Sequence, residues 1–412
     1  MVTQAKRRSL RGQQPRAKAT APRGGREPGA SRAAHVAPVD GAIVASTTLL
    51  VGLGIVMNYS ATAALAIGEP FPPLAVRHII GVGLALTGGT LAFCMPLSWW
   101  RRLALPLWLF SAGLLAATLF IGLEANGARR WLAVPGLRFA VQPAELARFA
   151  TTLAVAAVLA RAVERREVNA GALRRVIVLT GVPTLLLGLQ PDFSSDVLLV
   201  AVAGLLLFAA GLPFRLLAPP ALAAASAGAL YLVTHPYAWA RVGGFLDPWQ
   251  HARGGGFQLV QSFVAFGRGG SFGVGLGDGR QKLFFLPEAH TDFILSVVAE
   301  ELGLVGVLVI LGSFAAFAIA GMRVAGRAKQ PFALLAAFGM TGLVALPALV
   351  NAAVVMGVLP TTGLTLPFLS HGSNSLCCAA LAVGILLRIA AREAVSQPTR
   401  VAGATPRGLV RA

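Results

Sequence analysis

A run of sequence from Pro331 to Leu387 contains no Asp, Glu, Lys or Arg. A helix needs about 20 apolar residues to cross the hydrocarbon core of a bilayer, so this run holds two spans and the loop between them. The whole chain has the same character, because 56% of its residues are hydrophobic and 12% are charged. Soluble domains carry roughly 25% charged residues. The sequence therefore predicts a polytopic membrane protein.

Hydropathy predicts an all-α bundle of ten transmembrane helices in residues 41–393. We expect the spans at residues 42–66, 76–95, 103–122, 144–161, 175–190, 192–211, 216–234, 292–321, 332–355 and 373–391. No segment is large enough for a soluble domain. The longest loop, residues 235–291, separates the seventh span from the eighth.

Basic residues predict how the bundle is oriented. The net charge is +19, and residues 1–40 alone hold nine Lys and Arg against two acids. This tail has no apolar periodicity and no signal-peptide pattern, so we interpret it as a disordered cytoplasmic segment that touches anionic membrane lipid and binds no nucleic acid. Basic linkers at 96–102, 162–174 and 322–329 fall on the same side, as does the C-terminal tail, 394–412. The positive-inside rule then predicts a protein of the cytoplasmic membrane with both termini in the cytoplasm.

The opposite face carries the longer loops, 123–143, 235–291 and 356–372. Within the largest loop, residues 256–266 place Phe257, Val260 and Phe263 at helical spacing. Two interpretations remain open: a helix lying in the membrane interface, or a helix packed within the loop. The glycines of Gly273–Gly279 do not follow a strand, which excludes a nucleotide-binding loop and favours tight turns.

Asp292 is the main candidate for chemistry. It lies in Pro287-Glu-Ala-His-Thr-Asp-Phe293, where a polar loop enters an apolar helix. A carboxylate partly shielded from water suits general-base catalysis, and His290 and Thr291 could orient it. The residue types alone favour a helix N-cap over the general base, because Thr and Asp are preferred at that position and negative charge suits the helix dipole.

Other acidic residues in or next to the predicted spans also allow a functional and a structural interpretation. Glu300 and Glu301 lie deeper in the span that follows Asp292, where an acid lines a cavity or pairs with another helix. Asp192, in Gln190-Pro-Asp-Phe193, can cap the next helix or face a substrate. Asp196 adds an acid inside a span, with no partner that the sequence identifies.

Two arginines lie on the predicted exterior face, although most basic residues lie on the cytoplasmic face. Arg129 and Arg130 lie in the loop 123–143, on the side that the positive-inside rule assigns to the exterior. Arginine suits bidentate contact with phosphate or carboxylate. We therefore weigh a structural pair with Glu145 against contact with an anionic substrate.

Motifs in four separate loops resemble the SEDS family of bacterial membrane glycosyltransferases, and its FtsW-like branch in particular. They are Gly127-Ala-Arg-Arg-Trp131 with Gln142–Arg148, Gln190–Phe193, Gly267–Lys282 with Pro287–Phe293, and Leu359–Ser370, and the resemblance extends over residues 42–390. Asp292 matches the essential acid of the family, and Glu300 and Glu301 match its acid pair. The chain departs from the family pattern at Ser194 and Asp196, and at His371, Ser373 and Asn374, where the family reads Tyr-Gly-Gly-Ser-Ser from position 371.

The resemblance implies polymerisation of lipid II, the polyprenyl-linked disaccharide-peptide, into glycan strands, with Asp292 as general base. Arg253, Arg280 and Lys282 are the candidate cations for the substrate pyrophosphate. A divalent metal such as Mg²⁺ or Mn²⁺ would neutralise its charge, but the sequence shows no closed ligand set, so no cofactor is assigned. The implied partners are an FtsI-like class B penicillin-binding protein and other division proteins. Two alternatives are a lipid II flippase and a non-catalytic scaffold.

Overall fold

The computed structural model describes residues 40–63, 65–66, 71–125, 128–133 and 140–396, and these residues all fall within one compact unit. The expectations for the tails concern residues that lie largely outside the described part. The ten predicted spans are confirmed as helices: α1 (Gly41–Ala63), α2 (Pro73–Cys94), α3 (Leu97–Ile121), α4 (Pro143–Glu164), α5 (Ala170–Leu189), α6 (Phe193–Ala209), α7 (Phe214–Thr234), α10 (Ile294–Arg327), α11 (Pro331–Val355) and α12 (Ser373–Ser396). Of the described helices, nine are long and apolar enough to cross a membrane, while α6, with 17 residues, is a shorter apolar helix.

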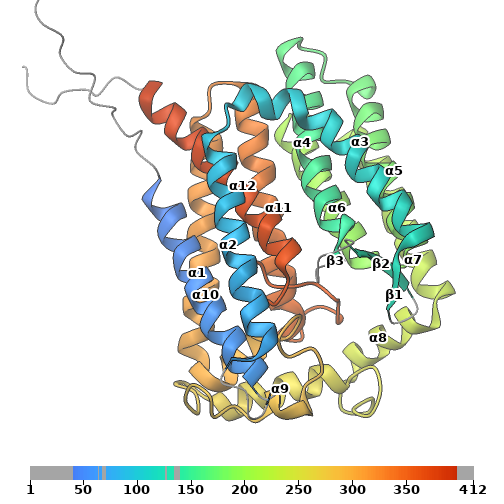
Figure 1. The fold of residues 1–412 in the computed structure, drawn as a ribbon. Coiled ribbons are helices and arrows are strands. Elements are labelled where there is room, and N and C mark those ends of the chain that lie inside the picture. The colour runs from blue at the N-terminus through green and yellow to red at the C-terminus, as the bar shows by residue number, and fades with distance from the viewer. Residues whose placement is uncertain (1–39, 64, 67–70, 126–127, 134–139, 397–412) are drawn as a thin grey trace, which may run out of the picture. The chain divides into compact units, whose positions relative to one another are not determined.

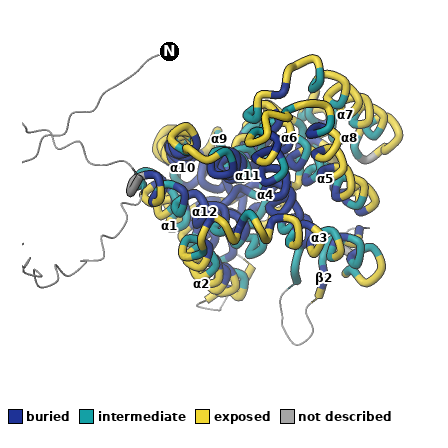
Figure 2. The backbone as a smooth tube through the Cα atoms, turned by 90° about the horizontal axis from the view of Figure 1, so that it is seen from above, coloured by how far each residue is buried: buried dark blue, intermediate teal, exposed yellow. Residues whose placement is uncertain are grey.

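Helix α4 lies at the centre of the bundle. Figure 2 shows α4 and α11 as mostly buried tubes, with α7 exposed at one edge. The sequence of α4 explains its position, because alanines occur on all of its faces and let α3, α5, α6 and α11 approach closely. In contrast, α7 buries no residue against the rest of the bundle.

The end of the bundle that carries the long loops is here called the loop face. Helices α8 (Pro236–Leu246) and α9 (Phe257–Gly269) lie across it (Figure 1), followed by the short π-helical turn η1 (Gln281–Phe285). A small antiparallel sheet, β1 (Leu123–Ala125), β2 (Ala128–Ala133) and β3 (Ala140–Val141), lies at the same end. This sheet is an addition to the predicted all-α bundle, because strands of two to six residues carry too little alternation to be recognised in a sequence.

Helix α9 resolves the two interpretations of residues 256–266 in favour of a packed loop helix. Its Leu259 and Ala265 are buried against the bundle. The hydroxyl of Ser262 donates to the carbonyl of Val355 and shares a hydrogen bond with Ser296. These contacts join the large loop to α10 and α11.

Helix α10 is broken at Gly303, whose φ is +66°. The break frees the carbonyls of Glu300 and Glu301, which accept hydrogen bonds from the amides of Val274 and Gly275. A Cβ at Gly273, where φ is +83°, would overlap the carbonyl of Glu301. The glycine-rich loop therefore makes the tight turns expected of it and satisfies the backbone groups of an interrupted span.

Candidate active site

Asp292 lies at the loop face, immediately before α10. The N-cap of α10 is Phe293, and no side chain caps this helix, so the capping role for Asp292 is wrong. The Asp292 backbone carbonyl accepts a hydrogen bond of 2.7 Å from the side-chain amide of Asn351. This contact from α11 fixes the segment, while the half-buried carboxylate faces Gly363, whose Cβ, if one were added, would lie 3.6 Å from Oδ2.

The electrostatic environment makes Asp292 a stronger base than an ordinary carboxylate. Burial, together with the negative charge of Glu288, raises the pKa of Asp292 to about 7, although the Arg241 guanidinium on α8 opposes the shift. Near neutral pH the group can therefore exchange a proton with a substrate. Arg241 also donates to the carbonyl of Thr361, so α8 contacts the segment 356–372 beside Asp292.

His290 and Thr291 do not hydrogen-bond the Asp292 carboxylate in the described structure, contrary to the role that the sequence suggested. The Thr291 hydroxyl donates to the carboxylate of Glu288 at 2.8 Å. Instead, the backbone of the motif is tied to the segment 356–372. The amide of His371 donates to the carbonyl of His290 at 2.9 Å, and the Ser370 hydroxyl donates to the carbonyl of Thr291.

Lys282 is buried and fully engaged with the protein, which corrects its predicted contact with pyrophosphate. Its ammonium donates to Glu301 Oε1 at 2.6 Å, to Ser60 Oγ at 2.8 Å and to the carbonyl of Gly277 at 2.7 Å. An ammonium has three N–H donors, and all three are used here. The residue joins α1, the glycine-rich loop and α10.

Glu300 has the structural role rather than the cavity-lining one. Its carboxylate accepts from the Arg268 guanidinium and from the backbone amides of Arg280 and Gln281, each at 2.9 Å. All three of these partners come from the large loop, Arg268 from its helix α9 and the other two from the segment that enters η1. The side chains of the other predicted cations, Arg253 and Arg280, are exposed at the loop face.

The charged residues of the first loop form other ion pairs than the sequence predicted. Glu145 pairs with Arg148, one turn along α4, so the predicted pair with Arg129 or Arg130 is wrong. Arg129 lies 3.5 Å from Glu124 in the neighbouring strand, and both side chains are largely exposed.

Arg130 instead holds the hairpin before α6. Its guanidinium donates to the carbonyls of Gln190 and Pro191. In that hairpin Asp192 accepts from the amide of Ser195, which confirms its capping role, and its side chain is buried. Asp196 Oδ1 is buried without a hydrogen-bond partner among the described residues.

Arg241, Asn351 and Glu288 belong to the surroundings of Asp292, and none of them was predicted as a site residue. Arg241 and Asn351 are distant from Asp292 along the chain, so no local spacing could reveal them. Among the described residues, no group of three or more His, Cys, Asp or Glu side chains is arranged to hold a metal ion.

Comparison with known proteins is consistent with this geometry. The profile of the FtsW/RodA/SpoVE family, described as cell cycle protein, matches residues 41–395. The chain is 39% identical over 357 residues to the probable peptidoglycan glycosyltransferase FtsW of Halomonas elongata, covering 85% of this chain and 90% of that one. The corresponding protein of Allochromatium vinosum is 41% identical over 374 residues, with 88% and 92% covered.

Two solved structures share the fold. One belongs to a study of the structural coordination of polymerization and crosslinking by a peptidoglycan synthase complex; it superposes with a TM-score of 0.71 at 30% identity, covering 86% of this chain and 98% of that one. The rod shape determining protein RodA of Thermus thermophilus gives a TM-score of 0.62 at 29% identity, with 85% and 96% covered.

Proposed function

Because this chain belongs to the FtsW/RodA/SpoVE family of cell cycle proteins, we propose that it is a peptidoglycan glycosyltransferase that polymerises lipid II during cell division. The single observation that carries the chemical part of the proposal is the environment of Asp292. Its half-buried carboxylate, with a pKa raised to about 7, lies at the membrane-proximal loop face beside the cation of Arg241.

Asp292 acts as the general base. It removes the proton from the acceptor sugar hydroxyl while that oxygen attacks the anomeric carbon of the donor. The new glycosidic bond forms as the bond from the anomeric carbon to the diphosphate breaks, and the lipid diphosphate leaves with the bonding electrons. Arg241 is placed to stabilise the negative charge near the reacting atoms, and the exposed Arg253 and Arg280 are free to attract the anionic substrate to the loop face.

The proposal includes an orientation and a partner. The loop face lies outside the cytoplasm, as the basic linkers of the opposite face suggest. One structural relative comes from a peptidoglycan synthase complex that combines polymerization with crosslinking, which supports a crosslinking class B penicillin-binding protein as the partner.

A flippase with a path along Asp196, Glu300 and Glu301 is the alternative from another functional class, and the surroundings of Glu300 and Glu301 argue against it. A transport path needs polar groups that a passing headgroup can reach. Glu300 and Glu301 are instead saturated by Arg268, Lys282 and backbone amides. Their saturation favours a structural role in the glycosyltransferase.

The decisive experiment is polymerisation of purified lipid II by this chain with its penicillin-binding partner. Asp292→Asn keeps the shape of the side chain but removes the base, so polymer should fall to background while the protein remains folded. Asp278→Asn, an exposed acid on the same face, is the matched control and should retain wild-type yield. Wild-type yield from Asp292→Asn would falsify the base assignment, and a scaffold role would then be favoured.

A further inference from the structure

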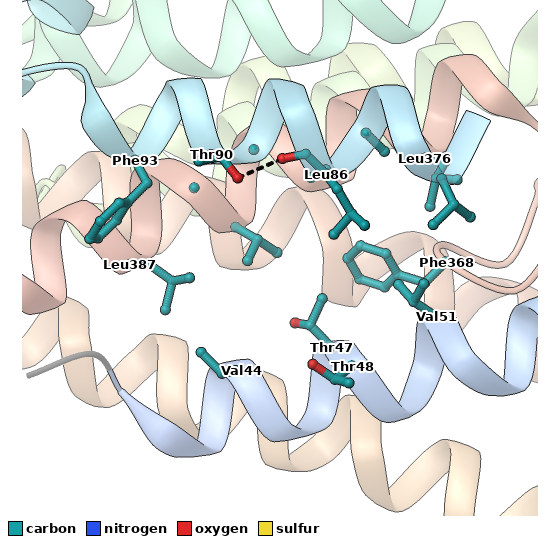
Figure 3. A pocket seen from close by; sticks show the side chains of 16 residues that line it. Val44, Thr47, Thr48, Val51, Leu86, Thr90, Phe93, Phe368, Leu376 and Leu387 are labelled. Atoms are coloured by element: carbon teal, nitrogen blue, oxygen red, sulfur yellow. Dashed lines mark hydrogen bonds between the residues drawn. The ribbon is translucent and has the colours of Figure 1, made fainter. Parts of the chain in front are cut away.

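An apolar groove runs along the bundle between α1, α2 and α12. Its volume is about 340 Å³, and Figure 3 shows Phe93 and Leu387 at one end and Phe368 and Leu376 at the other. Two lining residues, Val44 and Leu86, are exposed, so the groove opens sideways along the helices that cross the membrane. An open apolar groove of this kind fits a hydrocarbon chain.

A cluster of polar side chains lies just beyond the Phe368 end of this groove. His78 is one helical turn before the lining residue Val82 on α2, and His371 stands between Phe368 and Leu376 in the chain. The ring centroids of His78 and His371 are 6.1 Å apart, and those of His371 and His290 are 5.9 Å apart. Three imidazoles from α2, the catalytic motif and the segment 356–372 therefore meet at the loop face.

These imidazoles have unused hydrogen-bonding capacity. His78 is 1% exposed, yet neither of its ring nitrogens has a partner among the described residues. The same holds for Nδ1 of His371. A buried polar atom without a partner destabilises the fold, because it has given up its hydrogen bonds to water, so such a cluster indicates a ligand with polar atoms.

The charge of the cluster selects an anionic ligand. Burial, the neighbouring His290 and the positive charge of Arg77 together lower the pKa of His371 to about 4, so the guanidinium of Arg77, exposed on α2, lies near the cluster. Neutral imidazoles offer N–H donors, and the guanidinium offers a fork suited to phosphate oxygens. An apolar groove that ends at phosphate-binding donors matches an anionic lipid.

We propose that Arg77 and His371, with His371 supported by His78 and His290, bind the diphosphate of a polyprenyl diphosphate whose isoprenoid tail lies in the α1–α2–α12 groove. The choice of this lipid rests on the proposed function. The cluster includes His290, two residues from Asp292, and His371 donates its amide to the His290 carbonyl. A diphosphate bound here is therefore next to the catalytic segment. A polyprenyl diphosphate takes part in the proposed reaction, whereas a phospholipid does not.

The groove is tested with two matched substitutions. Thr90 and Thr87 are both exposed on α2, and each donates its hydroxyl to a carbonyl one turn earlier, but only Thr90 lines the groove. The full-length purified protein is titrated with undecaprenyl diphosphate, and the bound lipid is counted by native mass spectrometry. Thr90→Trp should weaken binding by about tenfold or more, which corresponds to about 1.4 kcal/mol, while Thr87→Trp should bind as the wild type does. Equal binding by the two variants overturns the tail site.

The diphosphate site at Arg77 and His371 is tested with Arg77→Gln and His371→Phe. Both substitutions remove a phosphate donor and retain much of the side-chain bulk. Each should weaken undecaprenyl diphosphate by about tenfold, as the loss of a charge-assisted or buried hydrogen bond would, and leave phosphatidylglycerol binding unchanged. If phosphatidylglycerol competes on equal terms with undecaprenyl diphosphate, the groove is a phospholipid site and the proposal fails.

Photocrosslinking tests the groove independently, in case one of the substitutions above prevents folding. A benzophenone amino acid replaces Phe93, which lines the groove, or Leu91, which is 65% exposed and does not line it. Irradiation should attach undecaprenyl diphosphate at position 93 in preference to 91, and equal labelling would contradict the inference. Binding is measured without catalysis, so a protein that polymerises lipid II but shows no groove binding refutes only this inference. Groove binding without polymerisation refutes only the proposed function.

Discussion

The ammonium of Lys282 lies 2.6 Å from the carboxylate of Glu301, and both side chains are almost completely buried. The pair joins η1 to the helix segment just before the break in α10. Ser60 extends it to α1, because its hydroxyl contacts both charged groups. Lys282 and Glu301 thus fasten the glycine-rich loop to α10, the helix that Asp292 precedes.

Removing one partner of this pair should destabilise the protein. Lys282→Met leaves Glu301 as an uncompensated buried charge, which costs about 3–5 kcal/mol. The double variant Lys282→Met with Glu301→Leu should recover much of that loss, because neither charge of the pair remains. Thermal unfolding in detergent measures both. A Lys282→Met protein with wild-type stability but impaired substrate use would instead restore the substrate-binding role.

The activity should depend on pH through Asp292. A base acts when it is deprotonated, and the pKa of Asp292 is raised to about 7, so kcat/KM should rise with pH and level off above that value. Glu288 contributes to the rise in the pKa and Arg241 opposes it. Glu288→Gln should therefore move the acid limb to lower pH, and Arg241→Gln should move it to higher pH. Shifts of the same sign in both variants would exclude Asp292 as the titrating group.

Gly273 should tolerate no side chain. Its φ is +83°, and an added Cβ would overlap the carbonyl of Glu301. Gly273→Ala should lower the unfolding temperature and the yield of folded protein, because the loop must move away from the break in α10. Gly267→Ala is the control, since a Cβ there meets nothing within 4 Å and the residue lies within α9. There alanine should be neutral or stabilise by up to about 1 kcal/mol.

The orientation of the bundle can be read by thiol labelling in whole cells. Ser271, exposed in the glycine-rich loop, and Ser9, in the N-terminal tail, are each replaced by Cys in a background without Cys94, Cys377 and Cys378. An impermeant thiol reagent should label position 271 and not position 9, because the positive-inside rule places the basic side in the cytoplasm. The reverse pattern would invert the topology.

Much of the fold follows from local sequence. Spans appear where about 20 apolar residues occur without charge, since the bilayer imposes that length whatever the neighbours are. The position of Asp292 at a loop–helix junction follows in the same way, and the motif around it suffices to suggest the family. Asp192 as the N-cap of α6 and the turns of Gly273–Gly279 are also local, because caps and positive φ depend on few neighbouring residues.

The partners of the charged residues were decided only by the tertiary structure. Nothing in the sequence spacing distinguishes a lysine that binds phosphate from Lys282, whose ammonium is enclosed by Ser60, Gly277 and Glu301 from three parts of the chain. Glu145 is an exception, because its partner Arg148 lies three residues along the same helix and sequence spacing alone could have identified it. Buried charges take whichever opposite charge or donor the packing brings within reach, and packing is a property of the whole bundle. The meeting of His78, His290 and His371 has the same origin, because three helix–loop junctions far apart in sequence converge at one end of the fold.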